Sequence, residues 1–254
     1  MLLLVAAPAL VVLIAVGFGV WWFFFRSDAP AEADIDVASD TLEQRNDPGA
    51  DDGAAGEAGE DAAESSGVDG TWVVDPTIGE FDSGAGVFTG TYAGYRIDEE
   101  LVQVGSNTAV GRTPEVTGEV TIEGNRLTGA DFQVDMTTLM SDEDLRDNTL
   151  TTRGLETNTY PTASFSLSEP VRLPPDATSG EQFAVTAVGE LTLHGVTNEV
   201  SVELDAQLDG DAIAVVGSAP VVLADYEIDR PSAPVVASVA GEGDFEFQIF
   251  LTQA

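Results

Sequence analysis

Residues 183–208 read FAVTAVGELTLHGVTNEVSVELDAQL, and this stretch decides the fold. Apolar and polar residues alternate almost without a break on both sides of His194-Gly195. Because successive side chains of a strand point to opposite faces, a period of two predicts two half-buried strands with one wet side. Two long amphipathic strands joined by a short turn form an antiparallel hairpin. The stretch therefore predicts a β-rich domain.

The surrounding sequence, from about Gly70 onward, contains more short β-rich runs separated by Gly, Pro and Asn. A switch of the inward-facing positions at Gly129-Ala130 predicts a β-bulge, which bends a sheet. A helical excursion is expected from about Asp142 to Leu155, because Ser141 can cap it and acids follow in the first turn. We expect strands at 71–75, 85–96, 99–110, 115–123, 126–136, 162–169, 181–194, 196–208, 211–224 and 241–252.

This set of elements predicts an all-β fold for residues 70–254. About eight long amphipathic strands with one helical excursion fit a closed antiparallel barrel. Closure explains how so many strands avoid exposed edges. A β-sandwich with a similar number of strands is the alternative.

The N-terminal segment is apolar. Leu2 to Phe25 carries no charge, and a helix of 24 residues spans roughly 36 Å, enough for a hydrocarbon core of about 30 Å. Trp21 and Trp22 near its end suit the headgroup level. The alternative is a cleaved signal peptide, whose apolar region is usually only about 7–15 residues. We expect residues 1–26 to be an uncleaved transmembrane anchor.

Residues 27–69 are expected to be a disordered linker. They hold 14 acids, one arginine and repeated Gly and Ala without apolar periodicity. Too little apolar surface and too much like charge keep such a segment unfolded. As a flexible coil, 43 residues would span about 35–40 Å end to end. Arg26 after the apolar run weakly favours a cytoplasmic domain by the positive-inside rule, whereas the acidic linker favours an extracytoplasmic one.

The composition excludes several classes of function. The chain has 45 acidic and nine basic residues, a net charge of −36, which repels nucleic-acid phosphates and anionic headgroups. Cysteine is absent, which excludes disulfides, thiolate nucleophiles, cysteine-ligated metals and a lipid-modified cysteine. No nucleophile elbow, phosphate-binding glycine loop or metal cluster is present, so we expect no enzyme and no cofactor. An undetected hydrolase or isomerase that uses buried acids is the remaining enzymatic alternative.

His194 is the only histidine. One imidazole cannot supply a typical zinc site, so we expect His194 to bond to the backbone of neighbouring loops. The acids at 142–147 lack the ligand spacing of an EF-hand and are expected to cap a helix and face solvent. No metal site is predicted.

Five short motifs are spread over residues 70–254. They are Trp72-Val73-Val74-Asp75, Asp142-Glu143-Asp144-Leu145-Arg146, Tyr160-Pro161-Thr162-Ala163-Ser164-Phe165, Leu191-Thr192-Leu193-His194-Gly195-Val196-Thr197 and Asp225-Tyr226-Glu227-Ile228. Their order and spacing resemble those of the YceI-like family of polyisoprenoid-binding proteins. Two places depart from the family pattern, namely 79–88 and Asn198, and the first leaves the alignment of the early strands open.

The resemblance implies a lipocalin-like barrel that holds an isoprenoid chain. Inward-facing residues could line such a tunnel or fill a packed core, since periodicity alone does not distinguish the two, and the resemblance favours the tunnel. Arg146 or Arg153 could meet a phosphate or quinone head group, although most arginines should pair with carboxylates. The candidate lipid-binding residues are Phe132, Phe165, Phe183, Leu191, Leu193, Val202, Leu204, Phe245 and Phe247.

The resulting functional hypothesis is non-catalytic binding of an isoprenoid lipid, a polyprenyl compound or quinone, for storage, shielding or transport. The resemblance also implies an extracytoplasmic domain, so we expect a single-pass protein of the cell membrane. An acidic interaction or stress-response module with a filled barrel is the alternative. A homodimer is left open.

Overall fold

The computed structural model describes residues 29–46, 68–102, 105–175, 177–232 and 235–254. The expected transmembrane anchor lies outside these residues. Within them, no helix is long and apolar enough to cross a membrane.

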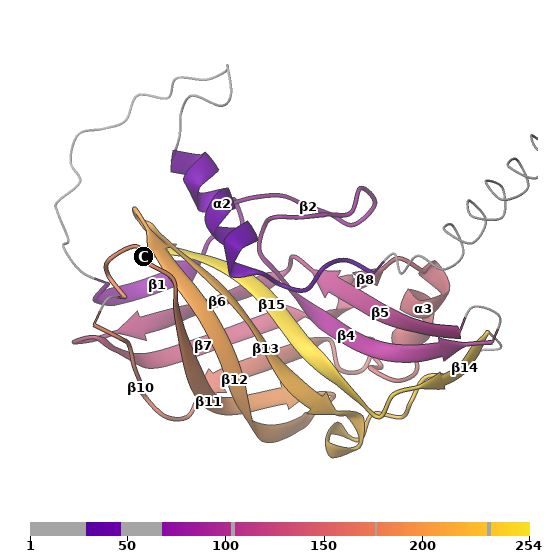
Figure 1. Ribbon diagram of the computed structural model, residues 1–254. Coiled ribbons are helices and arrows are strands. Elements are labelled where there is room, and N and C mark those ends of the chain that lie inside the picture. The colour runs from indigo at the N-terminus through magenta and orange to yellow at the C-terminus, as the bar shows by residue number, and fades with distance from the viewer. Residues whose placement is uncertain (1–28, 47–67, 103–104, 176, 233–234) are drawn as a thin grey trace, which may run out of the picture.

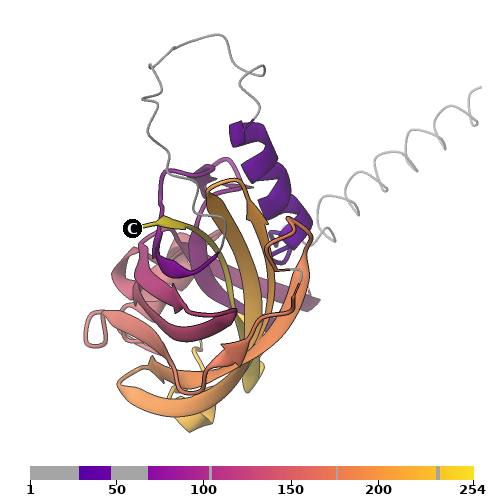
Figure 2. The same ribbon diagram turned by 90° about the vertical axis from the view of Figure 1, so that its left-hand side faces the viewer.

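Eight antiparallel strands form a closed barrel (Figures 1 and 2). Each strand pairs with its neighbour around the ring, and β1 pairs with β15 to close it. Closure confirms the predicted barrel and excludes the sandwich. In ring order the strands are β1 (Gly70–Val74), β6 (Val116–Ile122), β7 (Arg126–Asp135), β9 (Thr162–Leu167), β11 (Phe183–Leu193), β12 (Val196–Asp209), β13 (Ala212–Val222) and β15 (Glu242–Gln253).

β15 divides one of its edges between two partners. It pairs with β13 along one edge, while on the other edge residues 251–253 pair with β1 and residues 244–248 pair with β4 (Tyr92–Leu101). β4 forms a hairpin with β5 (Gly105–Thr113), and β14 (Val236–Val239) pairs with the far end of β4. This hairpin therefore extends the sheet beyond the closed ring.

Short elements complete the sheet. β8 (Met140–Ser141) pairs with β5, and β10 (Val171–Arg172) pairs with β7. The remaining elements are the hairpin of β2 (Phe81–Asp82) and β3 (Val87–Phe88) and the 3₁₀ turns η1 (Met136–Thr138) and η2 (Leu223–Tyr226).

The predicted hairpin at 183–208 is confirmed. β11 and β12 pair from Phe183↔Ala206 to Leu193↔Val196, and His194 and Gly195 form the turn with φ of 53° and 78°. Positive φ at both central residues is typical of the turn that matches the twist of two paired strands. The bulge is also confirmed, since Thr121 and Ile122 oppose Gly129 and Leu127, which leaves Thr128 as the extra residue.

Two predicted boundaries near the N-terminal side of the domain are wrong. The strands expected at 85–96 and 99–110 are divided elsewhere, because β4 continues to Leu101 and β5 begins only at Gly105. Residues 97–98 contain no glycine or proline that would stop an extended chain. The alternation is preserved, but the turn lies several residues later.

The helical excursion is shorter than predicted. α3 spans Asp144–Leu150, and its N-cap is Glu143 rather than Ser141. Ser141 instead ends β8, where its hydroxyl donates to the Asp147 carboxylate at 2.6 Å. The serine therefore ties the helix to the strand.

The prediction of a disordered linker is wrong for residues 29–46. α2 (Ile35–Asn46) packs on the outer face of β12 and β13, with Ala38 and Leu42 completely buried (Figure 1). Ile35, Ala38 and Leu42 lie at helical spacing, a signal that the acidic composition conceals. Their partners form a second core, namely Ile78, Ala212, Ala214, Val216 and Phe250. Residues 47–67 of the predicted linker lie outside the described residues.

A buried ion network fixes the chain just before α2. The Glu246 carboxylate accepts from Arg112 at 2.6 Å and from Arg96 at 3.2 Å, and all three side chains are largely buried. The two guanidinium groups also donate to the carbonyl oxygens of Ala31 and Pro30, respectively. A buried carboxylate with two cations needs such extra partners to offset its desolvation. Residues 29–46 are therefore part of the folded domain.

We expect Leu42→Ala to destabilise the domain by about 2–5 kcal/mol, because it removes a completely buried side chain between α2 and the barrel. The matched control is Val37→Ala on the same helix, where 44% of the side chain is exposed and the change should stay within about 0.5 kcal/mol. Urea unfolding of the chain from residue 27 onward measures both. Equal, small effects would mean that α2 does not pack on the barrel.

Candidate functional site

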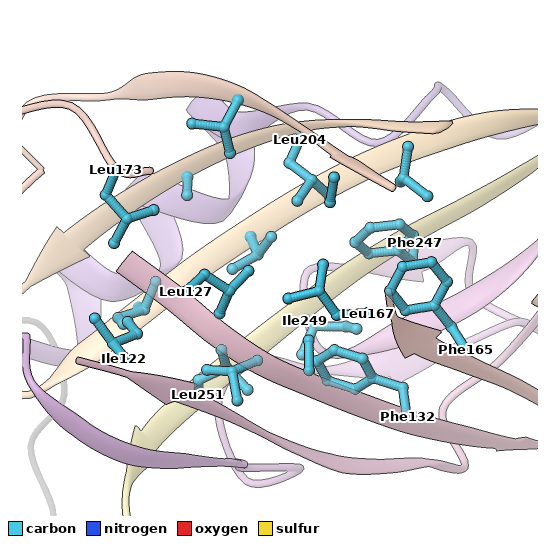
Figure 3. Close-up of a pocket in the computed structure, with 18 of the residues that line it drawn as sticks. Ile122, Leu127, Phe132, Phe165, Leu167, Leu173, Leu204, Phe247, Ile249 and Leu251 are labelled. Carbon is cyan, nitrogen blue, oxygen red and sulfur yellow. The ribbon is translucent and has the colours of Figure 1, made fainter. Parts of the chain in front are cut away.

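The barrel encloses an elongated apolar cavity with two compartments. The inner compartment has a cavity volume of about 120 Å³ and is lined only by apolar side chains of the barrel strands and adjoining loops (Figure 3). The outer compartment, of about 100 Å³, lies against β4, α3 and residues 221–231. Ala93, Val134 and Phe245 line both compartments, so the two are adjacent there.

All nine candidate lipid-binding residues lie on the cavity wall. Phe132, Phe165, Phe183, Val202, Leu204 and Phe247 line the inner compartment, Leu191 and Leu193 line the outer one, and Phe245 lines both. The prediction that they face inward is therefore confirmed, while their role in binding stays a prediction. Because the interior is hollow, the structure does not favour the filled barrel.

Glycines on neighbouring strands keep the aromatic rings against the wall. A Cβ at Gly189 would lie 2.3 Å from Cζ of Phe165, which the glycine hydrogen avoids. The ring of Phe247 lies in the same way on Gly217, and the ring of Phe132 on Gly118. Glycine within a strand often marks such a close approach. Each of these glycines occupies an inward-facing position of its strand, but the alternation of the sequence does not indicate which ring lies on it.

Loops close the inner end of the cavity. Val68, Leu173 and Ala177 are almost completely buried and line the inner compartment. The Trp72 indole donates to the Val68 carbonyl at 2.8 Å, and the Asn125 amide donates to the Leu173 carbonyl at 2.9 Å. These bonds fix both loops over the end of the barrel.

The outer compartment borders a polar pocket. Gly154 and Pro231 line both, and the polar pocket has a volume of about 470 Å³. These two residues place the polar pocket beside the outer compartment, and we call this end of the cavity its mouth. The charged residues of the polar pocket are Arg153, Glu156, Glu227, Asp229 and Arg230.

His194 holds the wall of the polar pocket in place. Its Nδ1 lies 3.1 Å from the Tyr226 carbonyl oxygen and its Nε2 lies 3.1 Å from the Glu156 carboxylate. The ring also packs on Tyr160 with centroids 4.2 Å apart. The predicted backbone contact is confirmed, and the carboxylate contact is an addition. Among the described residues, no group of three His, Asp or Glu side chains is placed to hold a metal ion.

The two head-group candidates occupy different environments. Arg146 pairs with Glu99 at 2.8 Å and with Asp142, so its donors are directed to carboxylates of the protein. Arg153 is exposed, lines the polar pocket and forms no ion pair within the described residues. Of the two, only Arg153 is placed to contact a group that emerges from the cavity.

Tyr95 is a polar residue on the wall of the outer compartment. Its hydroxyl is buried and has no hydrogen-bond partner among the described residues. Burial raises the pKa of Tyr95 well above its ordinary value, so the phenol stays protonated and can donate. This hydroxyl exposes no surface to the compartment, so Tyr95 contributes only the carbons of its ring to the wall.

The comparisons identify the family. A model of the YceI-like domain matches residues 88–251. The chain belongs to the YceI-like family. A comparison with curated proteins gives no match.

Three solved structures are similar to this YceI-like chain. A polyisoprenoid-binding domain from Saccharophagus degradans has 17% identity and a TM-score of 0.51, and the match covers 72% of this chain and 98% of that one. BcnA of Burkholderia cenocepacia has 15% identity and a TM-score of 0.49, covering 63% and 95%. The YceI protein of Campylobacter jejuni has 11% identity and a TM-score of 0.46, covering 57% and 84%. At 17% identity, the similarity to the Saccharophagus degradans domain shows a shared fold and no more.

We expect Gly189→Ala to destabilise the barrel by about 1–3 kcal/mol, because the added methyl group pushes the Phe165 ring into the cavity. In the double variant with Phe165→Leu the ring contact is relieved, while the Ser166 carbonyl oxygen still lies 2.6 Å from the added methyl group, so the two losses should add only in part. Urea unfolding of the two single variants and the double variant measures this coupling. Strict additivity would contradict the contact.

Proposed function

We propose that this protein binds an isoprenoid lipid without catalysing a reaction, with the apolar tail in the two-compartment cavity. The observation that carries the proposal is a barrel interior with two adjacent compartments, of which the inner one has only apolar side chains on its wall. Such a wall offers an apolar chain full burial and offers a polar ligand no hydrogen bonds. The family membership and the polyisoprenoid binding ascribed to the Saccharophagus degradans domain support it.

The energetics favour a tail of several units. Burial contributes about 0.8 kcal/mol for each CH₂ group, hence about 4 kcal/mol for each five-carbon isoprene unit. Association itself costs an estimated 4–15 kcal/mol. A single unit therefore does not hold a ligand, whereas several units along both compartments do.

The charged side chains of the polar pocket favour a ligand with a neutral head group. The polar pocket has two guanidinium groups and three carboxylates, and the whole chain carries a charge of −36. A diphosphate would meet net negative charge there. A quinone carbonyl or a polyprenol hydroxyl can instead accept from Arg153 without that repulsion. We therefore favour an isoprenoid quinone or polyprenol.

The biological setting is part of the proposal. The apolar segment at 2–25 would anchor the chain in the cell membrane, with the barrel on the extracytoplasmic side. Isoprenoid lipids reside in the bilayer, so an anchored barrel meets them at high effective concentration. Storage, shielding or transport of such a lipid is the resulting function.

Filling the cavity tests the proposal. Ala187 is buried on the wall of the inner compartment, and Ala184 on the same strand is exposed on the outer face. We expect Ala187→Phe to lower the affinity for a tetraprenyl quinone at least ten-fold, because the ring occupies the space of the tail. The control Ala184→Phe should bind as the unaltered protein does.

The measurement is retention of tritiated tetraprenyl quinone by the protein after gel filtration, with circular dichroism to check the fold. Unchanged binding by folded Ala187→Phe would place the ligand outside the cavity. No binding by the unaltered protein would refute the proposed function.

A further inference from the structure

Docking of residues 29–46 leaves only a short connection to the apolar segment. The apolar run ends at Phe25, and Pro30 is already fixed by its carbonyl contact with Arg96. Five Cα steps separate the two residues, which limits their separation to about 18 Å even in a fully extended chain. A barrel on a flexible linker of 43 residues would be much less restricted.

The docked segment leads toward the mouth end of the cavity. Ala31 contacts Arg112 of β5, and Pro30 contacts Arg96 of β4. Arg96 pairs with Val110, which lies two residues nearer the tip of the β4–β5 hairpin than Arg112 does. Ala29 and Thr108, nearer still, line one surface pocket. Figure 1 shows the described chain beginning at the end of the molecule that carries α3 and the hairpin. The outer compartment lies at this same end.

The most exposed large hydrophobic side chains of the described residues also lie at this end. They are Val102, Leu145 and Val235, with 61%, 58% and 56% exposure. The Val102 amide donates to the Val235 carbonyl at 2.9 Å, which places both at the tip of the hairpin. Leu145 precedes Arg146, whose ion pair with Glu99 holds α3 beside β4. We name Val102, Leu145 and Val235 the tip face.

We propose that the tip face rests on the lipid bilayer, so that the mouth of the cavity faces the membrane. The proposal rests on the membrane anchor of the proposed function. The length of chain between the apolar segment and Pro30 requires the barrel to stay near the bilayer, and the tip face is an apolar surface at the end of the molecule where the described chain begins. A lipid could then enter the cavity without crossing water.

The charge around the tip face defines the lipid surface that it accepts. The exposed acids Glu100 and Asp144 lie beside it in the chain, and anionic headgroups would be repelled. Contact through apolar side chains with a zwitterionic surface avoids this repulsion. Added salt should therefore not weaken the contact, in contrast to a basic membrane-binding patch.

Single cysteines test the orientation, since the chain has none of its own. The full chain would be reconstituted in phosphatidylcholine vesicles that contain a doxyl-labelled phosphatidylcholine, with a nitrobenzoxadiazole label on one introduced cysteine. Val102→Cys and Leu145→Cys report on the tip face. The controls are Ala184→Cys on the exposed outer face of β11 and Glu123→Cys in the turn near the closed end.

We expect the labels at 102 and 145 to be quenched at least three-fold more than those at 184 and 123. Equal quenching at all four positions, or stronger quenching at 123, would overturn the proposed orientation. Flotation of the same vesicles reports separately on the anchor, and a chain that does not float would overturn the proposal as well. Binding of tetraprenyl quinone by the chain from residue 27 onward distinguishes either failure from failure of the lipid-binding function.

Discussion

The division of one β15 edge between β1 and β4 determines the shape of the cavity. Where β1 pairs with residues 251–253 the ring is closed, and loops held by Trp72 and Asn125 cover that end. Where β4 pairs with residues 244–248 the wall departs from the ring, and the outer compartment forms against β4 and α3. One end is therefore closed and apolar, while the other leads to charged side chains. This polarity suits an amphiphile with a long tail.

The hollow interior depends on pairs of glycine and aromatic residues. An eight-stranded barrel is just wide enough to be filled by its own side chains. Here rings such as Phe165 and Phe247 lie on glycines of adjacent strands instead of crossing the interior. The period of two in the sequence predicted which residues face inward, but it carries no information on how far each ring extends. Cross-strand pairing, which decides this, is known only once the register is known.

The outer surface was harder to predict than the interior. The acids of residues 29–46 indicated disorder, yet Ala38 and Leu42 are buried against β12 and β13. The apolar run at Ala212–Val216 is consistent with this, since a strand covered on both faces loses its alternation. The roles of Arg96 and Arg112 could not be predicted, because their partner Glu246 is more than 130 residues away in the chain. The sequence does not distinguish Arg146 from Arg153. In the structure Arg146 forms ion pairs with Glu99 and Asp142, whereas Arg153 lines the polar pocket.

The central claim is that the cavity holds an isoprenoid lipid. Native mass spectrometry of the chain from residue 27 onward, purified from a bacterial host without detergent, tests it most directly. Our account predicts a stoichiometric adduct that organic extraction identifies as an isoprenoid quinone or polyprenol. Protein that carries no adduct, and that also takes up no added quinone, would contradict the account.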